Sequence, residues 1–305
     1  MAILNFGRPA PAARTADLGA EISGFSIEVM PRTAAKVEDF RALLPPGTRV
    51  YIAHIEGTPI EDMVATARRL AADGFPVMPH FPARIINDKD TLSDWIARYQ
   101  GEANVDQALL LAGGVSQPVG AFASSMDLLD AGLFDKAGFK RLHVAGHPEG
   151  NRDIDPDGSD AEVDAALRWK QDFSERTDAA MAIATQFVFE AEPVARWARR
   201  LRGDGITLPI HLGIAGPAKL QTLIKFAVAC GVGPSLRVLQ KRAMDVTKLV
   251  LPYTPDDLVG DLARLRAEAP ELGIEQLHIF PLGGIRTAAE WARNQTTKGA
   301  EAAQA

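Results

Sequence analysis

The sequence predicts an α/β fold in which one domain forms a single (β/α)8 barrel of the TIM type. Eight short apolar runs recur along the 305 residues, and segments with apolar residues at helical spacing separate them. Two of the runs, at 180–189 and 209–216, lack the polar alternation of a half-exposed strand, which favours a parallel sheet covered on both faces. Eight such repeats fit a closed barrel better than an open doubly wound sheet. The runs are 25–30, 49–55, 75–81, 107–114, 140–150, 180–189, 209–216 and 276–285.

The stretch from Ala179 to Gly216 contains the clearest repeat. Two apolar runs flank a segment in which Val194, Trp197 and Leu201 recur at helical spacing, so one stripe of the helix is expected to pack on the sheet. A β-α-β unit of this kind brings the C-terminal ends of both strands to the same edge. In barrels, that edge is the face that carries the ligand-binding residues.

Two helices are expected early in the chain. A helical stretch at 35–44 is followed by the Pro-Pro-Gly sequence at 45–47, which ends it. Met63, Ala67 and Leu70 recur at helical spacing after the second apolar run and predict the next helix.

About 60 residues separate the seventh and eighth runs, so two or three helices are expected there instead of one. The last of them is expected to begin with Thr254 as its N-cap and Pro255 at its first position. Nothing marks a domain boundary, so residues 1–305 are expected to form one domain. Within it, residues 1–20 are an N-terminal extension, and the small, polar tail at 296–305 is expected to fray.

Composition and charge argue against several classes of function and structure. The net charge of −6 and the pI of about 5.6 argue against nucleic-acid binding, because no basic face is available to neutralise phosphates. Cys230 is the only cysteine, which excludes an internal disulfide and a thiolate metal cluster. No apolar run approaches the roughly 20 residues of a membrane span, and the N-terminal sequence lacks the apolar core of a signal peptide. These features predict a cytoplasmic protein without a membrane partner.

Polar residues and glycines follow most of the predicted strands, so they are expected to collect on the C-terminal face of the barrel. No Ser-His-Asp order, P-loop or GxGxxG motif accompanies them. The residues are Glu28, Arg32, His54, Glu56, His80, Gly113, Gly114, His147, Glu149, Asn151, Gln186, Gly283, Gly284 and Arg286.

No metal site is expected. His143 and His147 are four residues apart, and on a strand that spacing spans about 13 Å, too far for the pair to chelate one ion. His211 and His278 are expected near the starts of their strands, on the face that contributes to stability rather than to chemistry.

Six strand-end sequences, taken in order and at their spacings, resemble those of the methylenetetrahydrofolate reductase family. They are SIEVMP, PHFPA, LLLAGG, AGHPEGN, ATQFVFE and LGIAGPAKLQ, and they span most of the chain. The resemblance implies a flavoprotein barrel that holds FAD noncovalently and passes a hydride between NADH or NADPH and the one-carbon unit of tetrahydrofolate. Its implied reaction interconverts 5,10-methylenetetrahydrofolate and 5-methyltetrahydrofolate, in one-carbon metabolism and methionine biosynthesis. The choice between NADH and NADPH, the direction of the reaction and a homo-oligomeric state are left open.

The resemblance implies that Glu28, in SIEVMP, is the catalytic acid. The reaction needs a proton donor to open the five-membered ring of methylenetetrahydrofolate into an iminium ion that accepts the hydride. A carboxyl between Ile27 and Val29 at the barrel mouth is expected to be desolvated, which would raise its pKa towards that of a useful acid. Without the resemblance, a solvated strand-end carboxylate or one half of a salt bridge is the simpler interpretation.

The resemblance also implies binding roles. Gln186 is expected to hydrogen-bond the folate ring system or the nicotinamide, because an amide both donates and accepts, and Arg286 is expected to contact the folate tail. From the residues alone, Gln186 would be a capped strand end, His80 a packed barrel histidine and Lys170 a surface lysine. The residues implied to bind the cofactor are His54, His80, Gly113, Gly114, His147, Asn151 and Lys170.

The chain departs from the family pattern at several strand ends. The family's Arg-Gly-Asp after the fourth strand is replaced by Ala-Gly-Gly at 112–114, so two charged groups are lost and weaker flavin binding is expected. The family's Tyr and His in the fifth loop are His147 and Asn151, and its Asn-Arg in the eighth strand is Gly-Gly at 283–284. A folate-binding barrel without redox activity, or a lyase or aldolase barrel, therefore stays open. A Schiff-base aldolase would need a strand-end lysine, and none of the eight predicted ends carries one.

Overall fold

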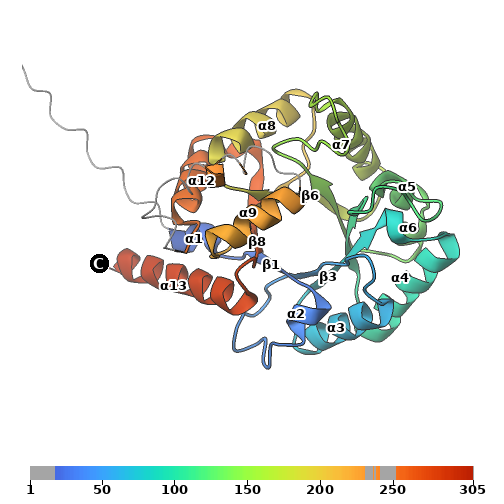
Figure 1. Cartoon of the computed structure of the whole chain (residues 1–305), viewed down its shortest axis with the longest axis horizontal. Coiled ribbons are helices and arrows are strands. Elements are labelled where there is room, and N and C mark those ends of the chain that lie inside the picture. The colour runs from blue at the N-terminus through green and yellow to red at the C-terminus, as the bar shows by residue number, and fades with distance from the viewer. Residues whose placement is uncertain (1–17, 231–235, 237, 241–251, 305) are drawn as a thin grey trace, which may run out of the picture.

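A closed barrel of eight parallel strands forms the centre of the molecule (Figure 1). The computed structural model describes residues 18–230, 236, 238–240 and 252–304. The strands follow one another in chain order, and β8 pairs with β1 to close the barrel, which confirms the predicted (β/α)8 fold. The strands are β1 (Ser26–Val29), β2 (Val50–Ile52), β3 (Val77–Pro82), β4 (Gln107–Leu111), β5 (Arg141–Gly146), β6 (Ala180–Val188), β7 (Ile210–Ala215) and β8 (Ile274–Phe280).

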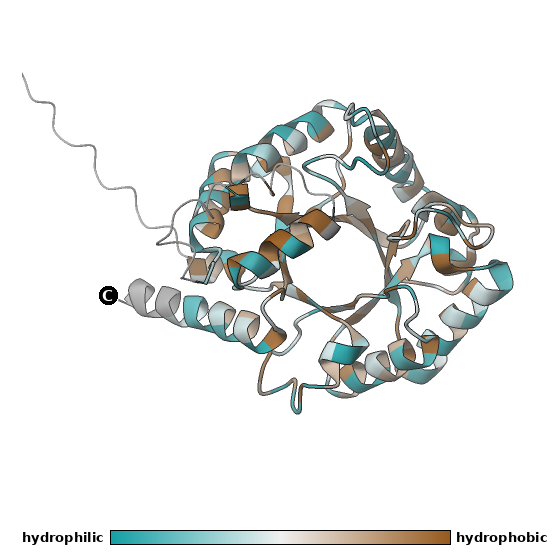
Figure 2. Ribbon diagram, viewed as in Figure 1, coloured by the Kyte–Doolittle hydropathy of each residue, from teal (hydrophilic) through white to brown (hydrophobic). Residues whose placement is uncertain are grey.

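Helices surround the barrel, and their ribbons mix hydrophilic and hydrophobic residues while the strands are mainly hydrophobic (Figure 2). The α-helices are α1 (Leu18–Ile22), α2 (Pro31–Ala34), α3 (Ile60–Ala72), α4 (Lys89–Ala103), α5 (Ser125–Asp130), α6 (Leu133–Lys136), α7 (Ala161–Ser174), α8 (Ala191–Gly203), α9 (Leu220–Ala229), α12 (Asp256–Glu268) and α13 (Ile285–Gln304). Two short 3-10 helices are η1 (Ala83–Ile85) and η2 (Pro270–Leu272).

Helix α8 shows how the sequence pattern produces the packing. The three residues at helical spacing, Val194, Trp197 and Leu201, are all buried, as predicted. Each such side chain contributes about 1.5–3 kcal/mol when it is fully removed from water. The arginines of the same helix lie on its other faces, so the helix has one apolar stripe against the sheet.

The predicted helix at 35–44 is wrong. Helix α2 ends at Ala34, and turns and bends follow it. The carboxylate of Asp39 accepts hydrogen bonds from the backbone N–H groups of Arg41 at 2.8 Å and Ala42 at 3.3 Å. Such local bonds from an aspartate compete with the hydrogen bonds of a helix. The helix before this segment instead begins at Pro31, whose fixed φ suits a first helical position.

In the described part of the segment between β7 and β8, α9 and α12 are helices and residues 236 and 238–240 are also helical, in agreement with the prediction of two or three. The rest of the segment that could hold a third lies partly outside the described residues. Helix α12 begins at Asp256, with Pro255 as the N-cap residue and no capping bond from a side chain, so the predicted start is wrong by one residue. Helix α13 is helical through Gln304, which includes most of the tail that was expected to fray.

Helix α9 lies over one edge of the barrel, beside its open centre (Figure 1). It packs on the ends of β6 and β7 through a second apolar cluster that includes Phe187, Phe189 and Leu223. Burial, and then the negative charge of Glu28, raise the pKa of the Cys230 thiol just after this helix. The end of α9 therefore lies within electrostatic reach of the barrel mouth.

Polar contacts join neighbouring elements at the N-terminal face of the barrel, which lies opposite the mouth. Arg49 donates a hydrogen bond to the side-chain oxygen of Gln107 at 2.8 Å, and Glu21 of α1 pairs with Arg266 of α12 at 2.7 Å. Residues 1–17 of the expected N-terminal extension lie outside the described residues. Within the described part of the chain, no helix combines the length and the apolar character needed to cross a membrane.

We expect Gly213→Ala to destabilise the barrel by about 1–3 kcal/mol, the usual cost of overpacking. A β-carbon at Gly213 would lie 2.6 Å from the carbonyl oxygen of Thr185 and 2.7 Å from that of Gln186, and neither backbone atom can yield easily. Urea unfolding measures the change. The matched control is Gly101→Ala in α4, where the new methyl group meets nothing within 4 Å and the helix should gain up to about 1 kcal/mol. Equal stability of the two variants would contradict this account of Gly213.

Candidate active site

A carboxylate and two imidazoles meet inside the mouth of the barrel. Successive residues of a strand point to opposite faces, so Ser26 and Glu28 of β1 point into the barrel while Ile27 and Val29 pack in the outer core beneath the helices. His80 of β3 and His278 of β8 lie beside Glu28. The predicted strand-end position of Glu28 is therefore confirmed as a barrel-mouth position.

The Glu28 carboxylate is close to both imidazoles. Its Oε2 lies 3.3 Å from Nε2 of His80 and 3.9 Å from Nε2 of His278, and 18% of its side chain is exposed. The first distance lies within hydrogen-bonding range, although the imidazole is not aligned for a hydrogen bond. The second distance needs a small rotation of the carboxylate before a hydrogen bond forms. Ser26 orients His278 from the other side, with its Oγ 2.9 Å from Nδ1.

The expectation of a raised pKa for Glu28 is wrong for the free protein. Burial raises the pKa of this carboxyl, but interactions with His278 and His80 outweigh burial and lower the pKa to about 2. The sequence prediction considered only the apolar strand neighbours, Ile27 and Val29, and these point away from the carboxyl. The free protein thus holds a carboxylate at the mouth at neutral pH, with two imidazoles as neighbouring proton carriers.

His278 was predicted on the wrong face of the barrel. Strand β8 begins at Ile274, two residues before the predicted start, because Ile274 continues the pairing with Ile210 of β7. His278 is therefore the fifth residue of β8 and lies in the barrel interior, next to Glu28. His211, in contrast, is the second residue of β7 and lies near the strand start, as predicted.

Three more polar rings fill the interior below Glu28. Tyr51, His143 and His211 are all buried, and sequence reasoning did not bring them together. Burial, together with the charge of His211, lowers the pKa of His143 well below its usual value. Burial also lowers the pKa of His211 to about 4, against the opposing effect of Glu275. These imidazoles are neutral at physiological pH.

Gln186 lies on a bulge near the C-terminal end of β6. The register of β6 against β7 shifts between Ala184 and Phe187, and Thr185 stabilises the shift by accepting a hydrogen bond from the N–H of Gly213 at 2.8 Å. The side-chain oxygen of Gln186 accepts from the N–H of Phe187 at 3.2 Å, and the residue is partly exposed. A bulge often redirects a side chain next to a functional site, so the amide is presented at the mouth with its N–H groups available to a ligand.

The turn after β4 offers backbone and no charged side chain. Gly113 has a φ of +97°, and a β-carbon there would lie 2.9 Å from the β-carbon of Pro82. The glycine is thus required by the turn itself, whether or not a ligand approaches. A β-carbon on Gly114 would meet nothing within 4 Å, so that position faces open space.

Lys170 is buried and close to His147. Only 6% of Lys170 is exposed, and burial lowers its pKa to about 8. Burial and then the charge of Lys170 lower the pKa of His147 to about 4. Among the described residues, no carboxylate pairs with the Lys170 ammonium. The interpretation of Lys170 as a surface lysine is therefore wrong. Asn151, after β5, accepts a hydrogen bond from the N–H of Asp153 at 2.9 Å and shapes the loop.

Two other predicted site residues lie away from Glu28. The ring of His54 lies tilted against that of Trp95 of α4, with the ring centroids 4.9 Å apart, and its Nε2 is 3.0 Å from the carbonyl oxygen of Thr58. Arg286 is exposed in the first turn of α13. Among the described residues, the Glu28 carboxylate pairs with His80 and His278 and with neither of these two side chains.

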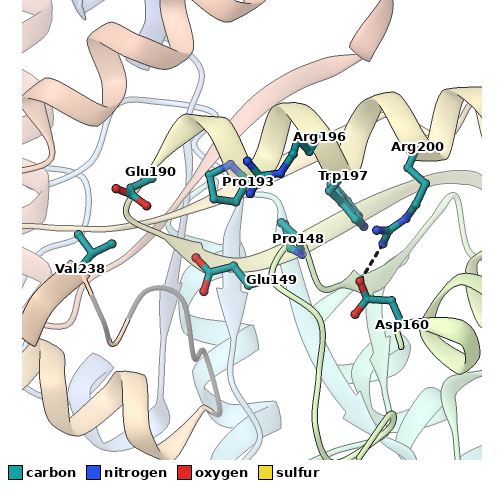
Figure 3. A pocket seen from close by; sticks show the side chains of 9 residues that line it. All are labelled: Pro148, Glu149, Asp160, Glu190, Pro193, Arg196, Trp197, Arg200 and Val238. Carbon is teal, nitrogen blue, oxygen red and sulfur yellow. Dashed lines mark hydrogen bonds and ion pairs between the residues drawn. The ribbon is translucent and has the colours of Figure 1, made fainter. Parts of the chain in front are cut away.

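A surface cavity of about 390 Å³ lies between the loop after β5 and helix α8 (Figure 3). Charged side chains line it, and Arg200 is already engaged by Asp160 at 3.2 Å. Across the described ranges, no group of three His, Cys, Asp or Glu side chains is arranged to hold a metal ion.

Comparison with known proteins supports the fold. No family model matches the chain. A protein from Clostridium thermocellum, whose structure is described as binding two copies of 5-methyl-5,6,7,8-tetrahydrofolic acid, aligns with a TM-score of 0.60 and 14% identity over 92% of this chain and 98% of its own. The catalytic domain of a mannanase from Streptomyces sp. SirexAA-E aligns with a TM-score of 0.45 and 14% identity over 84% of this chain and 74% of its own. The first alignment shows that the two chains share the barrel fold over nearly their whole lengths.

We expect His278→Gln to raise the pKa of Glu28 by at least about one unit, because the carboxylate loses a partner that favours its charged form while it stays buried. Infrared difference spectra across a pH titration, referenced to Glu28→Gln, follow the carboxyl group. The matched control is His54→Gln, which removes a buried imidazole that does not contact Glu28. A Glu28 that protonates at the same pH in both variants would contradict the assigned cause.

We expect the free energy of unfolding to fall as the pH drops from about 6.5 towards 4, by up to about 1.4 kcal/mol per pH unit for each buried histidine. The folded pKa values of His143, His211 and His278 are lowered, so the unfolded chain binds more protons in this window. The stability is fully present above the unfolded pKa and is lost as the pH falls towards the folded pKa. Urea titrations at several pH values measure the slope, and His211→Gln should reduce it. An unchanged free energy between pH 7.5 and 5 would overturn this account.

Proposed function

We propose that this chain binds a reduced folate at the C-terminal mouth of its barrel and is a flavin-dependent oxidoreductase. Its reaction would interconvert methylenetetrahydrofolate and methyltetrahydrofolate, with NADH or NADPH as the electron partner. The observation that carries the proposal is the Glu28 carboxylate inside the mouth beside His80 and His278. The Clostridium thermocellum protein, which shares the fold and binds 5-methyltetrahydrofolic acid, supports the choice of ligand.

Glu28 would move the proton that the folate chemistry requires. Opening the five-membered ring needs a proton at the folate N10, and Glu28 must carry that proton when the ligand is bound. The free carboxylate is partly exposed at the mouth, and a ligand that covers it removes the remaining water and raises its pKa. His278 and His80 lie close enough to exchange a proton with it. Burial under the ligand would thus convert the resting carboxylate into an acid.

Gln186 would orient the folate ring. A pterin ring presents both donors and acceptors along one edge, and an amide side chain can pair with both. The β6 bulge holds Gln186 at the mouth through the hydrogen bond from Gly213 to Thr185. Arg286 is exposed at the start of α13 and would contact the negatively charged tail of the folate.

Lys170 supports a flavin cofactor, because a buried ammonium group without an acidic partner in the described part of the chain suits a phosphate. Lys170, His147 and Asn151 would hold the diphosphate end of FAD. His80, His54 and the backbone of Gly113 and Gly114 would lie along its ring system. When bound, the flavin supplies hydride transfer between the nicotinamide and the folate.

The glycine turn favours a second candidate function, a folate-binding barrel without redox activity. Gly113 and Gly114 bring no charged side chain to the mouth, and Pro82 packs against Gly113. Such a barrel would bind methyltetrahydrofolate and stay colourless when FAD is added. Calorimetric titration with methyltetrahydrofolate, followed by titration with FAD, separates the two functions. Folate binding without flavin binding selects the second function, and the absence of folate binding rejects both.

We expect Glu28→Gln to slow the folate half-reaction by about 10² to 10⁴-fold, the usual contribution of a positioned general acid. Reduction of the flavin by NADH or NADPH needs no acid at the folate and should stay nearly unchanged. Stopped-flow recordings of flavin bleaching and recovery measure the two steps separately. Glu56→Gln, which alters an exposed carboxylate after β2, is the matched control. The proposal for Glu28 fails if both steps slow equally or if neither slows.

A further inference from the structure

A column of polar side chains in close contact runs along the barrel axis from Glu28 at the mouth to the opposite face. We call it the axial column, and it consists of His278, Ser26, Tyr51, His143 and His211. All five residues are buried. They come from β8, β1, β2, β5 and β7, so the column exists only once the barrel has closed.

We propose that the axial column is a proton path between Glu28 and the solvent at the N-terminal face of the barrel. Its use in catalysis rests on the role proposed for Glu28, whereas its capacity to carry protons does not. The path would let Glu28 regain a proton while a ligand covers the mouth.

The upper half of the column connects Glu28 with Tyr51. Nε2 of His278 faces the Glu28 carboxylate at 3.9 Å, and its Nδ1 lies 2.9 Å from Oγ of Ser26. The Ser26 hydroxyl is near enough to the Tyr51 hydroxyl to act to lower its pKa, and the ring of Tyr51 lies 4.4 Å from the ring of His278. Each of these groups both donates and accepts a proton.

The lower half connects Tyr51 with the solvent. The Tyr51 hydroxyl lies 2.6 Å from Nδ1 of His143, and the rings of His143 and His211 meet edge to face at 4.6 Å. Nε2 of His211 lies 3.2 Å from the carboxylate of Glu275, whose side chain is 61% exposed. Glu275 therefore gives the column an entrance from water on the N-terminal face.

Two buried nitrogens at the middle of the column distinguish it from a structural network in which every polar atom is hydrogen-bonded. In the described part of the chain, Nε2 of His143 and Nδ1 of His211 have no hydrogen-bond partner. Leaving buried polar atoms such as these unpaired is energetically unfavourable. They belong to neighbouring rings, so one ring can release a proton that the other accepts after a small rotation. A proton path explains why polar rings stand where barrels usually place branched apolar side chains.

The number of protons on the column is unchanged after each transfer. One proton enters at Glu275, each group accepts one proton and releases one to the next, and one arrives at the Glu28 carboxylate. Rotation of the hydroxyls and the imidazole rings restores the starting arrangement. Met78, Leu109 and Ala184 line the interior next to Tyr51 and offer no alternative carrier.

The test measures how fast the ring N–H of His143 exchanges with water, by nuclear magnetic resonance on protein that carries isotope-labelled histidine and tryptophan. His143 is 0% exposed, and the reference is the indole N–H of Trp197, which is 1% exposed and lies off the column. The Trp197 ring borders the cavity beside α8, but its indole nitrogen is buried, so its proton exchanges only when the structure opens locally. A conducting column makes His143 exchange much faster than Trp197. The experiment needs neither folate nor flavin, so its failure is distinct from failure of the proposed function.

Three variants locate the path. Ser26→Ala cuts the upper half and His211→Gln cuts the lower half, so each alone should leave His143 connected to water through the other half. The double variant should slow its exchange at least about tenfold, because only structural opening then remains. Tyr99→Phe removes a buried hydroxyl without a hydrogen-bond partner among the described residues, outside the column, and should change nothing. The proposal is overturned if wild-type His143 exchanges as slowly as Trp197, if either single variant abolishes fast exchange, or if the double variant retains it.

Discussion

The buried charge of Glu28 is the interaction on which the rest of the site depends. A carboxylate inside a barrel is costly unless neighbouring groups stabilise its charge. His80 and His278 do so at 3.3 and 3.9 Å, and Ser26 holds His278 in place. The requirement for these partners explains why an imidazole from β8 lies opposite a carboxylate from β1. It also explains why the resting group is a base that must gain a proton before it can act as an acid.

The close approach of backbone segments at the mouth is the second constraint on the geometry of the site. The bulge of β6 is possible because Gly213 lets the β7 backbone approach Thr185 and Gln186 without a side chain between them. The turn after β4 likewise depends on Gly113, which packs against Pro82. One glycine thus positions the amide of Gln186, while the other maintains a turn that carries no charged side chain. These two glycines therefore determine the shape of the mouth around Glu28 and Gln186.

Repeating patterns made the fold predictable from sequence, because few folds accommodate eight apolar runs that alternate with amphipathic helices. Glu28 and Gln186 could be placed at the mouth for the same reason, since strand ends of a parallel barrel share one face. His278 could not be placed, because its position depends on where β8 starts and on the pairing of β8 with β7 and β1. The direction of the Glu28 pKa shift was wrong for the same reason, because residues distant in sequence determine it. The burial of Lys170 likewise depends on how α7 packs.

A crystal structure of the protein with methyltetrahydrofolate tests the central claim most directly. The account predicts that the folate ring lies inside the barrel mouth, with N10 facing the Glu28 carboxyl group and the pterin edge paired with Gln186. Folate bound outside the mouth, for example in the cavity beside α8, would contradict it. A mouth that stays empty at saturating folate concentration would contradict it equally.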